Sequence, residues 1–170
     1  HGQLYAWTGR KLFKLDITQT FPLAAKYINK IYDSGVEPLS TNVFSTSWWA
    51  NLVAAQTSLF FFYTTDGQST LYEFDATQGG GGGPVWDAPI GFSIKSCKYS
   101  NGILYMCGHW GGDTNSHGWG AIYAMPLDTR RPEFIGYFRK QNNMQLQMQE
   151  TAASYGSTVM VAAGGTGRVF

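Results

Sequence analysis

A hairpin-like pattern that recurs along the chain constrains the fold more than any other feature of this sequence. In each copy, a short apolar run leads into a turn and then into a second run that contains an aromatic residue. The aromatic residues of the second runs are Phe13, Tyr72, Tyr123 and Phe170, which lie 59, 51 and 47 residues apart. Kelch repeats span about 50 residues and WD40 repeats about 40 to 45, and both build four-stranded propeller blades. The spacing therefore predicts an all-β chain made of such blades.

The segments between the hairpins are expected to supply the remaining strands. A run of small and polar residues precedes each later hairpin, at 52–56, 94–99 and 151–155. A candidate outer strand follows each second run, at 30–33, 84–87 and 132–138. This order predicts one propeller arc over residues 1–170, with antiparallel blades at 1–35, 50–90, 92–139 and 150–170, the first and last being partial. Propellers close with 4 to 8 blades. We therefore expect this arc of about three and a half blades to belong to a larger ring, completed by further residues or by another copy.

Composition and charge exclude several classes of protein. The chain has 170 residues, 44% apolar and 16% aromatic, which suffices for one packed domain and argues against disorder. Twelve basic and eleven acidic residues leave a formal charge of +1, so no basic surface for nucleic acid is expected. The apolar runs, such as 59–63, are far shorter than the ~20 residues of a membrane-spanning helix. We expect a soluble protein with neither a nucleic-acid partner nor a membrane span.

Two unusual segments interrupt the repeat. Residues 79–83 are five consecutive glycines, which predict a flexible loop between the third and fourth strands of the second blade. An engineered linker would look similar, although the repeat continues in order across it. In 144–149, Met alternates with Gln, which indicates a half-buried strand rather than a functional methionine-rich site.

The two cysteines are predicted to be free thiols. The Asn101-Gly102 pair between two apolar runs is the strongest short-range signal for a hairpin turn. A two-residue turn there pairs Cys97 with Met106, which puts Cys97 and Cys107 one register step apart on opposite faces. A nucleophilic cysteine would also need a nearby base, and the sequence places none.

The long insert of the third blade contains the candidate metal ligands. His109, Asp113 and His117 are evenly spaced there, and two imidazoles with a carboxylate are competent zinc ligands. The oxygens of Asp113, Thr114 and Asn115 could instead hold calcium, but the EF-hand order and its bidentate Glu are missing. The glycine-rich composition favours an ordinary loop, so we expect no cofactor.

Tryptophans suggest a ligand-binding surface. Trp110 and Trp119 bracket the insert, and Trp48 and Trp49 lie together before the second blade. Aromatic platforms beside amides such as Asn115 suit sugar rings, whose apolar face stacks while the amide binds hydroxyls. The alternative, favoured by the aromatic packing between propeller blades, is that most of these tryptophans belong to the core.

No catalytic motif is present in the sequence. Nucleophile elbows, phosphate-binding loops and paired-carboxylate signatures are missing, and no helix start or Lys follows the glycine run. Asp16, Asp75 and Asp128 recur in the repeat, but each ends a strand and begins a turn, which favours a structural role. We therefore predict that the chain is not an enzyme.

The repeat units, in particular 4–16 and 59–75, resemble the propeller repeats of tailed-bacteriophage virion proteins, such as nozzle and minor tail proteins. The resemblance covers most of the chain and rests on degenerate motifs. It implies a structural module of the virion, a spacer or docking ring that joins neighbouring subunits or meets the host surface. No site residues of that family carry over.

Two alternatives keep the propeller. One is a soluble or secreted, lectin-like propeller that binds glycans outside the cell. The other is an enzyme, because 120–125 resembles the strands of quinoprotein blades. The tryptophan docking pattern of quinoproteins is not repeated in this sequence, which argues against a quinone cofactor.

Overall fold

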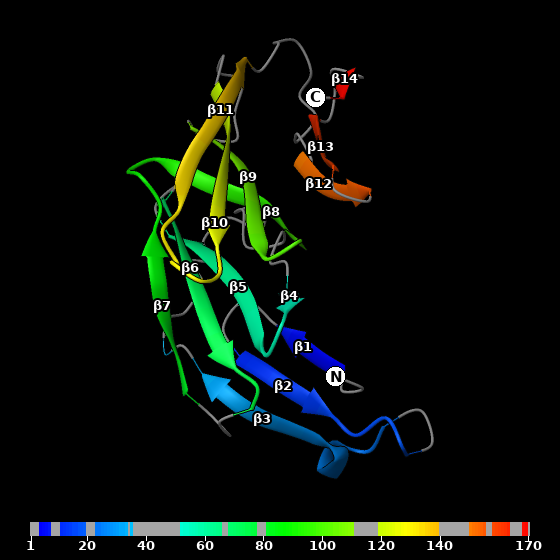
Figure 1. Cartoon of the computed structure of the whole chain (residues 1–170). Helices are drawn as coiled ribbons and strands as arrows, with labels where there is room; N and C mark the ends of the chain where they lie inside the picture. The colour runs from blue at the N-terminus through cyan, green and yellow to red at the C-terminus, as the bar shows by residue number, and fades with distance from the viewer. Residues whose placement is uncertain are drawn as a thin grey trace.

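The computed structural model is built of antiparallel β-sheets, and its described residues include one 3-10 turn, η1 (Ala25–Tyr27) (Figure 1). It describes residues 4–7, 11–19, 23–33, 35, 52–65, 68–77, 81–110, 119–139, 150–155, 158–163 and 168–169. In the last three ranges only the backbone is described. Within these ranges, no helix is long and apolar enough to cross a membrane. The predicted all-β class is confirmed.

The strands form four sheets, each made of strands that follow one another in the chain. The first sheet contains β1 (Leu4–Trp7), β2 (Lys11–Leu15) and β3 (Ile28–Asp33), and the second contains β4 (Leu52–Ala55), β5 (Ser58–Thr65), β6 (Gln68–Asp75) and β7 (Gly81–Asp87). The third contains β8 (Phe92–Ser100), β9 (Ile103–Trp110), β10 (Trp119–Pro126) and β11 (Glu133–Arg139), and the fourth contains β12 (Glu150–Tyr155), β13 (Thr158–Ala163) and β14 (Arg168–Val169).

An irregularity in strand register recurs at the same place in the first three sheets. The pairing shifts by one residue between Leu12 and Phe13, between Leu71 and Tyr72, and between Ile122 and Tyr123. Each shift adjoins the aromatic residue from which the sequence spacing was measured. Such a bulge adds one residue to the outer strand and increases its twist. The sequence repeat is thus also a repeat of backbone geometry.

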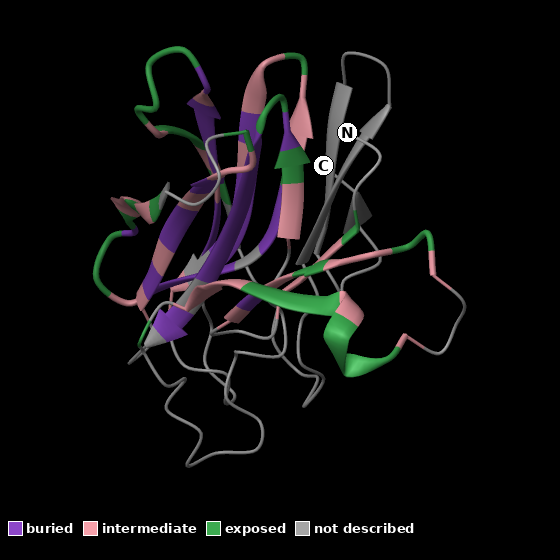
Figure 2. Ribbon diagram, turned by 90° about the horizontal axis from the view of Figure 1, so that it is seen from below, coloured by how far each residue is buried: buried purple, intermediate pink, exposed green. Residues whose placement is uncertain are grey.

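The second sheet is buried on both faces, which explains its continuous apolar run. Along β5, Phe60 and Phe62 belong to a core shared with the third sheet, whereas Leu59 and Phe61 belong to a core shared with the first sheet. Successive side chains of a strand point to opposite faces, so a strand covered on both sides needs apolar residues at every position. Figure 2 shows the buried residues concentrated in strands behind the mostly intermediate and exposed first sheet.

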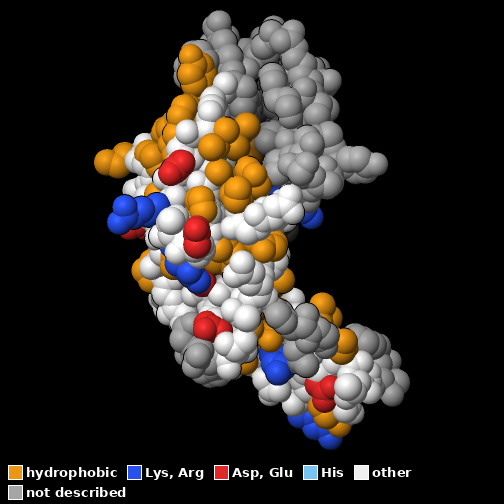
Figure 3. Space-filling view, in the orientation of Figure 1, with side chains coloured by type: hydrophobic (Ala, Val, Ile, Leu, Met, Phe, Trp, Pro, Cys, Tyr) orange, Lys and Arg blue, Asp and Glu red, His pale blue; other side chains and the backbone are white. Residues whose placement is uncertain are grey.

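The sheets follow one another along a curved path (Figures 1 and 3). The first strands of consecutive sheets are neighbours, since β4 lies beside β8 and β8 lies beside β12. In Figure 1 the last strands of the first three sheets, β3, β7 and β11, lie toward the opposite side. The sheets therefore share one side that is formed by first strands.

The prediction of a flexible glycine loop is wrong for Gly81–Gly83, which form the beginning of β7. These residues pair with Asp75, Phe74 and Glu73 of β6. A Cβ atom on Gly82 would lie 3.1 Å from the Tyr32 ring and 3.2 Å from the Phe74 ring. The glycine strand therefore lets an aromatic ring of the first sheet approach the backbone of the second, a packing role that composition alone does not reveal.

The hairpin prediction around the cysteines is confirmed. Cys97 pairs with Met106, and both Asn101 and Gly102 adopt the positive φ angles of the expected turn. Cys97 and Cys107 are both buried and are not joined by a disulfide. The predicted strand at 144–149 lies outside the described residues.

An ion pair joins the second and third sheets near the turn after β10. The Arg130 guanidinium donates two hydrogen bonds to the Glu73 carboxylate, each 2.7 Å long, and a third to the Leu127 carbonyl. The Ser58 hydroxyl donates to the same carboxylate. Arg130 has a φ of 52°, a conformation that is costly for a residue with a side chain. The paired hydrogen bonds help to offset that cost.

Replacing Glu73 by Gln should lower the free energy of unfolding at neutral pH by about 1–2 kcal/mol, because Arg130 loses its charged acceptor. The hydrogen bonds from Arg130 hold the pKa of Glu73 below its ordinary value of 4.5. The stabilisation is therefore present above that pH and is lost as the pH falls through the lower pKa of the folded protein. In urea titrations, the difference between wild type and E73Q should shrink toward acidic pH. The exposed Glu133→Gln control should have little effect, and a difference that does not depend on pH would contradict this assignment.

Candidate functional site

The predicted ligand residues that the structure describes lie at one rim of the third sheet. Trp110 ends β9 and Trp119 begins β10, and the adjoining residues His109 and Gly120 are paired across the two strands. The side chains of His109 and Trp119 are not described. The other predicted residues, Trp48, Trp49, Asp113, Asn115 and His117, lie outside the described residues.

Trp110 contributes to the core between the second and third sheets. Its ring is half-buried, with its centroid 4.8 Å from that of Phe92, which in turn contacts Tyr123 at 5.3 Å. A Cβ atom added to Gly91 would lie 3.9 Å from the Trp110 ring. This position agrees with the interpretation that tryptophans of the chain pack between sheets.

A close backbone approach positions this rim. A Cβ atom on Gly108 would overlap the Ser93 carbonyl oxygen and would lie 2.8 Å from the Phe92 ring. Only glycine lets β9 approach β8 so closely, at a point where the register between the strands shifts between Ile94 and Ser96. Gly108 therefore allows Phe92 to lie across β9 and to contact Trp110.

Ser69 provides a buried polar link between this rim and the second sheet. Its hydroxyl accepts a hydrogen bond of 2.7 Å from the Ile94 backbone N–H of β8 and shares another hydrogen bond with the Thr64 hydroxyl. Ser69 is fully buried. Because a buried N–H without a partner is costly, this link fixes the start of the third sheet against the second. Sequence reasoning missed it, since an isolated serine in a strand carries no signal.

The metal hypothesis remains a prediction, because only the backbone of His109 among the three candidate ligands is described. Within the described part of the chain, no three His, Cys, Asp or Glu residues gather in a metal-binding arrangement.

The recurring aspartates act as turn residues. The Asp16 carboxylate accepts hydrogen bonds from the backbone N–H and hydroxyl of Thr18, and Asp75 makes the same two contacts with Thr77. The Thr18 hydrogen bonds hold the pKa of Asp16 below its ordinary range. These are the local bonds of an aspartate that begins a turn.

Burial keeps two titratable groups of the core, Cys97 and Tyr123, in their neutral forms. Burial raises the pKa of the Cys97 thiol far above its ordinary value, and it also raises the pKa of the Tyr123 hydroxyl. A thiol that stays protonated is a poor nucleophile.

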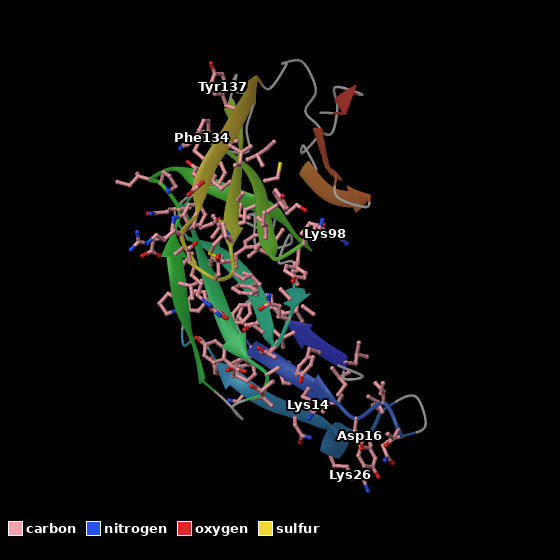
Figure 4. All side chains as sticks on the ribbon, viewed as in Figure 1. Lys14, Asp16, Lys26, Lys98, Phe134 and Tyr137 are labelled. Carbon is pink, nitrogen blue, oxygen red and sulfur yellow. The ribbon has the colours of Figure 1, made fainter. Side chains whose placement is uncertain are left out.

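Two apolar surfaces that sequence reasoning did not single out are exposed. Phe134, Ile135 and Tyr137 on β11 are 50%, 58% and 66% exposed, and Figure 4 shows Phe134 and Tyr137 at the end of the molecule opposite Lys14 and Lys26. At that opposite end, Leu4 and Ile28 of the first sheet are 45% and 38% exposed. The signal available in the sequence was the apolar run 134–138 in a strand expected at a sheet edge.

No protein-family model matches the chain, and no curated protein matches its sequence.

Substituting Gly108 by Ala should destabilise the protein by about 1–3 kcal/mol, because the new methyl group overlaps the Ser93 carbonyl. Gly136→Ala is the matched control, since nothing lies within 4 Å of the corresponding position on β11. Gly108→Ala should also change the near-ultraviolet circular dichroism spectrum, because the new methyl group displaces Phe92 and Trp110. Gly136→Ala should leave that spectrum unchanged. Equal stabilities of the two variants in thermal unfolding would refute the proposed close approach.

Proposed function

We propose that the chain is part of a β-propeller that acts as a non-catalytic structural module of a larger assembly, such as the tail of a tailed bacteriophage. The observation that carries this proposal is the way the sheets succeed one another. The second sheet packs against a neighbour on each face, and the first strands of the last three sheets are neighbours. Radial repetition of antiparallel sheets about an axis has this property, with the first strands innermost.

The recurring bulge supports the same interpretation. The register shifts at Phe13, Tyr72 and Tyr123 mean that the outer strand of each of these sheets bends at an equivalent place. A repeated bend accompanies sheets that are repeated units of one architecture. The sequence units 4–16 and 59–75, which resemble phage virion propeller repeats, fall in two of these sheets.

The specific contacts between sheets suit a structural part of an assembly. The Glu73–Arg130 ion pair and the Ser69–Ile94 hydrogen bond each join the second sheet to the third, beside a continuous apolar core. A spacer or docking ring in a particle requires sheets that keep their relative positions. The implied partners are other subunits of the same assembly, and the implied location is the virion.

A glycan-binding propeller is the second candidate. The observation that favours it is the position of Trp110 and Trp119 on neighbouring strands at one rim, on either side of the insert that contains Asn115. This alternative corresponds to an extracellular protein with a small-molecule ligand.

The native protein, isolated from its source, distinguishes these functions. We expect it to sediment in a multi-protein particle, and peptide mapping should find the peptides of 1–170 there at a fixed ratio to the other subunits. Recovery as a free protein that binds a glycan array, with binding lost in Trp119→Ala but kept in a Trp86→Phe control, would overturn the structural role and favour the lectin-like one. A bound chromophore in the absorption spectrum would also overturn it.

A further inference from the structure

The contacts between the first three sheets follow one rule. An aromatic residue from the last strand of one sheet lies on an aromatic residue of the next sheet. Tyr32 of β3 contacts Tyr72 of β6, with centroids 6.5 Å apart, and Trp86 of β7 contacts Tyr123 of β10 at 5.1 Å. We call Tyr32 and Trp86 the docking aromatics, and Tyr72 and Tyr123 the receiving aromatics.

The docking aromatics share a local sequence and a register. They occur in Ile31-Tyr32-Asp33 and Val85-Trp86-Asp87, each a β-branched residue, an aromatic residue and an aspartate. Each follows the bulge of its strand and lies opposite a buried leucine, Leu12 or Leu71. Each receiving aromatic directly follows the residue at which the register of its own strand shifts, Leu71 for Tyr72 and Ile122 for Tyr123. One local sequence therefore serves the same packing role twice.

The first sheet has a residue at the receiving position, and no docking aromatic from the described residues packs on it. Phe13 has the register of Tyr72 and Tyr123. The strand pairing puts it on the same face as Leu4, Ala6, Leu15 and Ile28, whereas Trp7 and Leu12 are on the face that packs against the second sheet. The face around Phe13 is apolar toward β1 and the end of β2, has Lys30 opposite Phe13 with Lys11 and Asp33 beyond it, and points away from the rest of the stack; we call it the open face.

The equivalent face of the second sheet shows what such a surface binds. There, Tyr32 lies among Phe61, Tyr72 and Phe74, at centroid distances of 5.7, 6.5 and 6.2 Å. On the open face the corresponding residues by register are Ala6, Phe13 and Leu15. These side chains are also apolar, and Ala6 is much smaller than Phe61. Ile28 occupies the position equivalent to Gly82, so a docked ring is expected to lie over Ala6 and Phe13 rather than against the outer strand.

The outer strands described here do not offer a free docking aromatic. Tyr32 and Trp86 are already packed within the chain, and the third outer strand has Gly136 at this position, opposite Ile122. At this register a second copy of these three strands offers no further aromatic residue, since the exposed Phe134 and Tyr137 lie at other positions of β11. The occupant must have a different sequence.

We propose that the open face binds one further antiparallel sheet, carried by a polypeptide segment other than residues 1–170, whose last strand places an aromatic ring on Phe13. By analogy with β3 and β7, this strand has a β-branched residue before the aromatic and an aspartate after it. The inference rests on the proposed propeller, since it names what continues the stack beyond the first sheet. The open face is the next position in a series of contacts that the chain makes twice, at Tyr72 and at Tyr123.

Site-specific photo-crosslinking in the native assembly tests this proposal. Phe13 is replaced by p-benzoylphenylalanine in the complete native polypeptide, the assembly is irradiated, and the cross-linked peptide is sequenced by mass spectrometry. Ile28 on the same face provides a second position, since it is 38% exposed and tolerates a larger side chain more readily. Tyr72 is the positive control, which should cross-link to the β3 peptide, and Ile90, 88% exposed in the turn before β8, is the negative control.

We expect Phe13 and Ile28 to cross-link to one peptide with the β-branched–aromatic–aspartate sequence from outside residues 1–170. A cross-link to any residue within 1–170, including one in a second copy, would overturn the proposal, as would a peptide without that sequence. The proposal also fails if neither position cross-links while Tyr72 reaches β3. These results do not depend on whether the particle is a virion, so a failure of this inference is distinguishable from a failure of the proposed function.

Discussion

The burial of the second sheet on both faces is the constraint on which the rest of the structure depends. A strand such as β5, with Leu59 to Phe62 apolar throughout, has no polar face to turn toward water. Burying each of these side chains contributes about 1.5–3 kcal/mol, so the sheet is stable only when both neighbours are in place. Adjacent sheets therefore form one cooperative stack rather than independent units.

Glycines and polar links set the distances within that stack. Gly82 allows Tyr32 to lie close to β7, and Gly108 allows Phe92 to lie across β9. The Glu73–Arg130 pair and the Ser69–Ile94 hydrogen bond then fix the second sheet to the third toward opposite ends of β6. Apolar burial is non-directional, whereas these contacts specify one relative position. Together they explain how degenerate repeats maintain a common packing geometry.

Much of the architecture could be predicted from the sequence, because apolar runs and turn residues act locally. The Asn101-Gly102 turn fixed the pairing of Cys97 with Met106, and the spacing of Phe13, Tyr72 and Tyr123 marked equivalent strands. The glycine run was misjudged because its role depends on Tyr32, a residue of another sheet. The Glu73–Arg130 contact joins residues 57 positions apart and leaves no pattern in the sequence. Of the candidate ligand residues, Trp110 alone has a described side chain, and its packing on Phe92 depends on Gly108, a tertiary effect that composition does not show.

The proposed propeller requires these sheets to radiate about a common axis, which a cryo-electron microscopy reconstruction of the native assembly would show. We expect a closed ring of antiparallel sheets in which β4, β8 and β12 line the axis and β7 and β11 face outward. A straight row of stacked sheets, or first strands that diverge from any common axis, would contradict it.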